Sequence, residues 1–155
     1  MFRAATVDDL PAILALLVDD ELRKLREDLG PPLNPRYLAA FEAIERDSNQ
    51  LLAVADQDGE VVGCLQITFI PGLSRLGMWR GQIEAVRVAA TQRGSGVGRA
   101  MLLWAIEQCR ARGCGLVQLT TEKRRADAHR FYARLGFEAT HEGMKLRLPS
   151  AAEPE

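Results

Sequence analysis

The chain has 155 residues, of which 20 are basic and 21 acidic, so its formal net charge is −1, and 47% of its residues are hydrophobic. This composition excludes intrinsic disorder and predicts one domain over residues 1–148, with a loose tail over 149–155. The near-neutral charge disfavours general nucleic-acid binding. Nor does any apolar run approach the roughly 20 residues that span a bilayer.

The start of the chain and its cysteines predict a cytoplasmic protein. Asp8 and Asp9 follow the N-terminus closely, which is unlike a secretory signal peptide. The cysteines are odd in number and lack CxxC spacing, and the two histidines are far apart, so we expect reduced thiols and neither disulfide nor metal site. These residues are Cys64, Cys109, Cys114, His129 and His141.

The first half of the chain predicts a strand, several helices and a hairpin. Residues 2–5 fit a short strand, and Thr6 fits a helix N-cap with Asp9 in the capping-box position. A second helical stretch carries Leu22, Leu25 and Leu29, and another helix begins at Asn34-Pro35. Strands are then expected over residues 51–55, 61–70 and about 78–88, with a hairpin turn at 56–59 and a loop at 71–77.

The second half predicts a strand–helix–strand unit followed by a helix and a hairpin. The expected elements are a helix after Gly98 to about Arg112, a strand over 116–121, a helix ended by Gly136, and strands over 137–140 and 144–148. The strand–helix–strand unit predicts a parallel pair with a right-handed crossover. The fold class is therefore α/β (α+β), with a mixed, mostly antiparallel sheet and helices on both faces.

A glycine-rich loop between a strand and a helix is the most informative segment. Glycines permit positive φ and close approach of a ligand, and N–H groups at a helix start converge on an anion, so the loop suits a pyrophosphate. It ends in Gly-Arg-Ala, unlike a Walker A loop, and its GxGxG spacing departs from the Rossmann pattern. The loop residues are Arg93, Gly94, Ser95, Gly96, Val97, Gly98 and Arg99.

Three motifs resemble the GNAT family of N-acetyltransferases. Arg93-x-x-Gly96-x-Gly98 is similar to the family's R/Q-x-x-G-x-G/A loop. Ala128-x-x-Phe131-Tyr132-x-x-Leu135-Gly136-Phe137 resembles its second motif, and Ile83-Glu84-x-Val86-x-Val88 resembles the strand before the loop. The element order matches over essentially the whole chain. The resemblance implies acetyl-CoA or another acyl-CoA as co-substrate, no metal, and a homodimer.

One position departs from the family pattern. Many members carry Asn three residues before the motif alanine, where this chain has Arg125 within the run Lys123-Arg124-Arg125. The basic run either reaches the cofactor's phosphates or forms a solvated helix start. No role of the asparagine is therefore carried over to Arg125.

The resemblance also implies roles at the site. Tyr132 would protonate the departing thiolate, although Phe131 and Tyr132 would also fit as core residues. Glu84 is the candidate base on its own account, since it is a carboxylate in a strand that is otherwise largely apolar near the loop; binding of the substrate's ammonium and a structural pairing are the alternatives. The backbone of Val86, Arg87 and Val88 would hydrogen-bond to the pantetheine as a neighbouring strand does, and the Val86 N–H would donate a hydrogen bond to the oxyanion. His129 is expected on the surface.

The facing of Glu84 depends on the regularity of its strand. A period of two puts Glu84 on one face with Val86 and Val88, and Arg87 on the other face. A bulge in the strand would change this arrangement.

The sequence offers two groups of candidate residues for the pocket of the acceptor amine. Asp19-Asp20-Glu21 is either an acidic wall for a cationic amine or a solvated helix face, and Trp79, Arg80 and Tyr37 are further candidates for the pocket. The expected function is transfer of the acetyl group to a primary amine of a small molecule by direct attack. An acetyl-CoA-binding sensor without turnover and a protein N-acetyltransferase are the alternatives.

Overall fold

A computed structural model of the protein describes residues 1–19 and 27–149. The chain forms two compact units, residues 1–119 and 120–155. In the described part of the chain, no helix is long and apolar enough to cross a membrane. Leu22 and Leu25 of the predicted second helix, with Asp20 and Glu21, lie outside the described residues, and Leu29 lies in irregular backbone.

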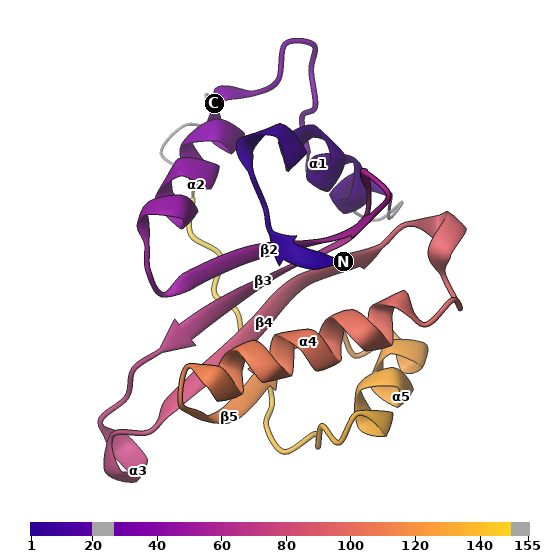
Figure 1. Cartoon of the computed structure of the whole chain (residues 1–155). Coiled ribbons are helices and arrows are strands. Elements are labelled where there is room, and N and C mark those ends of the chain that lie inside the picture. The colour runs from indigo at the N-terminus through magenta and orange to yellow at the C-terminus, as the bar shows by residue number, and fades with distance from the viewer. Residues whose placement is uncertain (20–26, 150–155) are drawn as a thin grey trace. The chain divides into compact units, whose positions relative to one another are not determined.

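A five-stranded sheet in the order β1-β2-β3-β4-β5 forms the centre of the first unit (Figure 1). Its strands are Phe2–Ala4 (β1), Gln50–Gln57 (β2), Glu60–Ile70 (β3), Trp79–Val88 (β4) and Cys114–Leu119 (β5). Three pairings are antiparallel, and β4 pairs with β5 in parallel. The predicted mixed sheet with a central parallel β-α-β unit is confirmed.

Helices cover both faces of this sheet, as predicted. They are α1 (Leu10–Val18), α2 (Pro35–Arg46) and α4 (Val97–Ala111), with single 3-10 turns at Val7–Asp9 (η1) and Ala90–Gln92 (η3). Ile13 and Leu16 of α1 pack against Cys64 of β3. A Cβ on the adjacent Gly63 would lie 3.3 Å from Sδ of Met101 in α4. Neighbouring strand residues face opposite ways, so α1 and α4 lie on opposite faces.

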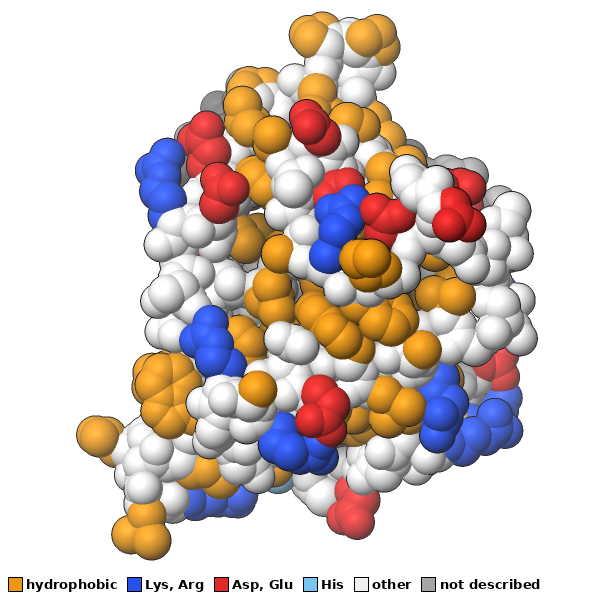
Figure 2. All heavy atoms as spheres, viewed as in Figure 1, with side chains coloured by type: hydrophobic (Ala, Val, Ile, Leu, Met, Phe, Trp, Pro, Cys, Tyr) orange, Lys and Arg blue, Asp and Glu red, His pale blue; other side chains and the backbone are white. Residues whose placement is uncertain are grey.

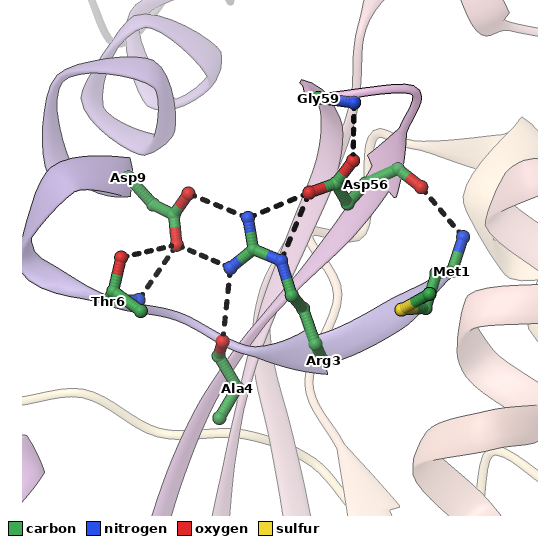
Figure 3. A network of polar contacts seen from close by, with 7 residues as sticks. All are labelled: Met1, Arg3, Ala4, Thr6, Asp9, Asp56 and Gly59. Atoms are coloured by element: carbon green, nitrogen blue, oxygen red, sulfur yellow. Dashed lines mark hydrogen bonds and ion pairs between the residues drawn. The ribbon is translucent and has the colours of Figure 1, made fainter.

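An arginine near the N-terminus joins three segments of the first unit (Figure 3). Arg3 donates hydrogen bonds to both carboxylate oxygens of Asp9 at 2.7 and 3.0 Å, and to Asp56 at 2.9 Å. The predicted capping box is confirmed, because the Thr6 N–H donates to the Asp9 carboxylate at 2.7 Å. The hydrogen bonds from Arg3 lower the pKa of Asp9 to about 2.

Replacing Arg3 with methionine should lower the urea midpoint of unfolding, because Asp9 is only 8% exposed and would lose its cationic partner. In the wild type, the stabilisation from Asp9 is complete above its ordinary pKa of 3.8 and is lost as the pH falls towards 2. The variant should lose most of this dependence. Arg46→Met, which breaks an exposed pair with Glu42, is the control and should change the midpoint little.

The connection between β3 and β4 contains a short helical turn where the sequence predicted only a loop. This turn is α3 (Ser74–Gly77), in which Arg75 and Leu76 have positive φ. Leu73 and Leu76 are fully exposed, and Figure 2 shows hydrophobic side chains protruding where Figure 1 places α3.

The second unit contains α5 (Ala126–Arg134) and an irregular segment. The predicted hairpin over 137–140 and 144–148 is wrong, because the described residues form no strand after Leu119. Its alternating apolar residues Met144, Leu146 and Leu148 are 94%, 88% and 79% exposed, so no packed face holds them. A hairpin that lacks such a face is marginal in water.

Candidate functional site

The glycine-rich loop leads into α4 with its backbone open to a ligand. Gly94 and Gly96 have φ of 78° and 90°, which L side chains rarely adopt, and a Cβ on either would meet nothing within 4 Å. Gly96 is the N-cap of α4, and no described side chain caps this helix. The N–H groups of its first turn therefore point to a space that can accept an anion.

Two of the predicted loop residues also have partners within the first unit. Arg93 Nη2 lies 3.0 Å from Asp19 Oδ2 at the end of α1, and both side chains are about half exposed. Ser95 Oγ donates to the Gln92 carbonyl at 2.6 Å, and the Ser95 N–H donates to the same oxygen at 3.2 Å. Ser95 thus fixes the turn that presents the loop, whereas Arg93 remains reachable from solvent.

A β-bulge interrupts β4 just before the loop. Glu84 pairs with Gln66 and Arg87 pairs with Cys64, so Ala85 and Val86 together oppose a single residue of β3. Ala85 has a φ of 53°, which is unusual for a residue with a side chain.

The bulge corrects the predicted facing of the strand. Gln66 and Cys64 lie two residues apart on β3 and share a face, so their partners Glu84 and Arg87 also share one. Val88 pairs with Gly63 and lies on the opposite face. The prediction that Glu84 shares a face with Val88, with Arg87 on the other, is therefore wrong, because the bulge adds one residue to the alternation.

The parallel ladder between β4 and β5 ends before the bulge. Its last pair is Ile83 with Leu119, although β4 continues to Val88. The edge of β4 from Glu84 to Val88 therefore extends beyond its parallel neighbour. Backbone polar groups at such a position require partners, and an extended amide-bearing ligand can supply them.

Polar side chains on four strands share the sheet face of Glu84, and they were not predicted from the sequence as a group. Gln66 Nε2 and Thr68 Oγ1 both donate to Gln50 Oε1, at 2.9 and 3.0 Å, and Gln118 Nε2 donates to Gln82 Oε1 at 3.0 Å. All are half-buried, whereas Glu84 is exposed. The alternation of polar residues in β3 and β4 is the signal that could have found them.

The cysteines do not offer a nucleophile. Burial raises the pKa of Cys64 to about 12 and that of Cys109 to about 11, and it also raises the pKa of Cys114. All three are free thiols and remain protonated near neutral pH. Among residues 1–19 and 27–149, no group of three His, Cys, Asp or Glu side chains could hold a metal ion.

The second unit carries Tyr132 on α5. Its ring lies edge-on to Phe131, with centroids 5.3 Å apart, and to Phe137, at 5.9 Å. His129 is half-buried, and its Nε2 lies 3.0 Å from the Glu122 carbonyl oxygen. Arg125 occupies the N-cap position of α5, and its N–H donates to the same carbonyl at 3.0 Å. The aromatic contacts fix the ring of Tyr132 within this unit.

Comparisons with known proteins place these features in one family. Residues 14–137 match the acetyltransferase (GNAT) family. The chain is 34% identical to an aminoalkylphosphonate N-acetyltransferase of Salmonella typhimurium, over 90% of this chain and 85% of that one. It is 32% identical to a glucosamine 6-phosphate N-acetyltransferase of Trypanosoma brucei brucei, over 85% and 98%.

One solved structure is similar to this chain over nearly its whole length. The crystal structure of a transcriptional regulator from Bacillus halodurans C-125 matches with a TM-score of 0.92 and 47% identity, over 96% of this chain and 99% of that one. The glycine loop, the strand before it and the aromatic motif all lie within or at the edge of the matched span. The chain therefore belongs to the GNAT family of acetyltransferases.

Proposed function

We propose that the protein transfers the acetyl group of acetyl-CoA to a primary amine of a small molecule by direct attack on the thioester. The observation that carries this proposal is the open glycine loop at the uncapped start of α4, which directly follows the strand that bears Glu84. The named activities of two relatives, on aminoalkylphosphonate and on glucosamine 6-phosphate, support a small-molecule amine as the acceptor.

Acetyl-CoA would be held along β4 and the loop. The N–H groups of the first α4 turn and the side chains of Arg93 and Arg99 would bind the pyrophosphate, where open space next to Gly94 and Gly96 admits it. The backbone of Val86 to Val88, beyond the end of the β5 ladder, would pair with the pantetheine amides. The co-substrate supplies the activated acetyl group.

Three protein groups would transfer protons or stabilise charge during acetyl transfer. Glu84 would take the proton of the attacking amine, directly or through water, because its carboxylate is exposed on the polar sheet face. The Val86 N–H would stabilise the developing oxyanion, and the Tyr132 hydroxyl would protonate the departing thiolate. No covalent protein intermediate is needed, which agrees with the protonated state of the cysteines.

The proposal is tested by measuring acetyl-CoA binding by calorimetry and CoA release with a panel of primary amines. We expect binding in the absence of amine and release only with some amines. A protein that binds acetyl-CoA but releases no CoA with any small amine would contradict small-molecule transfer. Release with peptide N-termini alone would instead assign the protein to protein acetylation.

Glu84→Gln should depress kcat/KM at neutral pH and recover partly at high pH. An amine with a pKa near 10.4 is only about 0.04% neutral at pH 7 but about 4% neutral at pH 9, so a base matters less at the higher pH. The measurement is the pH profile of kcat/KM for an amine found in the panel.

Two other profiles would change the assignment of Glu84. A raised KM with no recovery at high pH would identify it as a ligand of the substrate's ammonium, and native kinetics throughout would remove both roles. Glu45→Gln, which alters an exposed carboxylate on α2, is the matched control and should leave the profile unchanged.

A second candidate function is an acetyl-CoA-binding module without turnover. It is favoured by the similarity to the Bacillus halodurans protein that is described as a transcriptional regulator. The calorimetric and release measurements above distinguish the two, because a module of this kind binds acetyl-CoA and never consumes it. We also propose a cytoplasmic setting, since three free thiols are typical of reducing compartments.

A further inference from the structure

Three alternate residues of β4 form a polar row on one face of the sheet. Arg80, Gln82 and Glu84 pair with successive alternate residues of β3, and the register is regular over this span. Their side chains therefore point to the same face, which is the face that α1 covers further along β3. The row precedes the bulge, so the bulge does not disturb it.

The two ends of the row carry opposite charges that have no ion-pair partner among the described residues of the first unit. Glu84 is exposed and Arg80 is half-buried. A Cβ on Gly72 would lie 3.7 Å from Arg80 Nη1, so the guanidinium lies near the start of the β3–β4 connection. Four residues of strand separate the two Cα atoms by roughly 13 Å, with Gln82 between them, so a ligand that meets both charges must lie along the row.

The middle of the row is an amide held in one orientation. Gln118 donates to Gln82 Oε1 at 3.0 Å, which leaves the Gln82 amide N–H groups available as donors. Neighbouring amide and hydroxyl groups on β2 and β3 satisfy one another through Gln50. The row thus offers a cation, a hydrogen-bond donor and a carboxylate in sequence.

We propose that the acceptor amine carries an acid group, and that Arg80 binds this group while Glu84 receives the amine. This inference rests on the proposed acetyl transfer and specifies its substrate class as small zwitterions, with the ammonium and a phosphonate, phosphate or carboxylate several bonds apart. A guanidinium matches such acid groups with two parallel hydrogen bonds. An amine without an acid group would leave Arg80 without a counter-ion, so it is the poorer substrate.

The test compares 2-aminoethyl-, 3-aminopropyl- and 4-aminobutylphosphonate with alkylamines of the same chain length. We expect the wild type to prefer the best phosphonate over its matched alkylamine by about 10- to 100-fold in kcat/KM. Arg80→Gln should reduce this ratio to near one. Arg80→Lys should keep part of it, since lysine retains the positive charge but cannot form the two parallel hydrogen bonds of a guanidinium. Arg75→Gln, on the exposed α3 turn, should keep the wild-type ratio.

The ratio separates recognition of the acid from a general loss of structure, which would lower both rates together. An absent preference in the wild type, or an unchanged ratio in Arg80→Gln, would overturn the inference. Calorimetry with 3-aminopropylphosphonate gives a second readout. Binding that Arg80→Gln abolishes would support the acid site even if no amine released CoA, a result that would reject acetyl transfer alone. Equal binding by both proteins would overturn the acid site whatever the turnover.

Discussion

Gly98→Asp should weaken acetyl-CoA binding by about 100-fold or more while leaving the fold intact. The added carboxylate would stand in the first turn of α4, where the loop is proposed to hold the pyrophosphate, and like charges at such a contact repel strongly. The same carboxylate interacts favourably with the helix N-terminus, so helix stability should not fall. Calorimetry and thermal unfolding of the variant measure the two effects separately.

Two further variants isolate charge from shape. Gly98→Ala adds a methyl group without charge and should bind acetyl-CoA much more tightly than Gly98→Asp. Gly96→Asp should also weaken acetyl-CoA binding strongly, but the φ of 90° at this position makes the substitution strained, so some stability should be lost with it. If folded Gly98→Asp binds acetyl-CoA as the wild type does, the pyrophosphate does not bind at this loop.

Tyr132→Phe should lower kcat by 10²- to 10⁴-fold and leave acetyl-CoA affinity nearly unchanged, since it removes a positioned acid and little else. The remaining ring keeps its edge-on contacts with Phe131 and Phe137, so the helix should stay folded. Steady-state kinetics with an amine from the panel, together with calorimetry, give the two quantities.

Packing is the alternative role of Tyr132, and Phe137→Leu tests it. This variant weakens the aromatic contact but keeps the hydroxyl, so it should lower stability more than kcat. A Tyr132→Phe enzyme with wild-type turnover would leave the tyrosine as a packing residue and remove it from the mechanism.

The parts of the fold that local sequence signals determine were predicted well. The Thr6–Asp9 capping box, Asn34 before α2, and the glycines at the start of α4 act within a few residues of chain, so their patterns identify the elements. The β-α-β unit was predicted because a strand, a helix of about fifteen residues and a second strand are the usual connection between adjacent parallel strands.

Features that depend on distant partners were missed. The bulge at Ala85 exists only relative to β3, and it reversed the expected facing of Arg87 and Val88. Alternation in the last segment predicted a hairpin, but a strand also needs a face to pack on, which the pattern cannot supply. The hydrogen bond that joins Gln82 of the polar row to Gln118 of β5 forms only when the two strands are set in register.

The ion pair between Arg93 and Asp19 would compete with the pyrophosphate that we propose for this loop. An anion that binds Arg93 would compete with a carboxylate that is tethered next to it, and a tethered group is present at high effective concentration. A small inorganic anion makes few other contacts with the protein, so it would gain little binding free energy by replacing Asp19 at Arg93. A pyrophosphate that also binds the backbone at the start of α4 would gain more, so we expect the exposed Arg93–Asp19 pair to give a small preference for ligands with several contacts over inorganic ions.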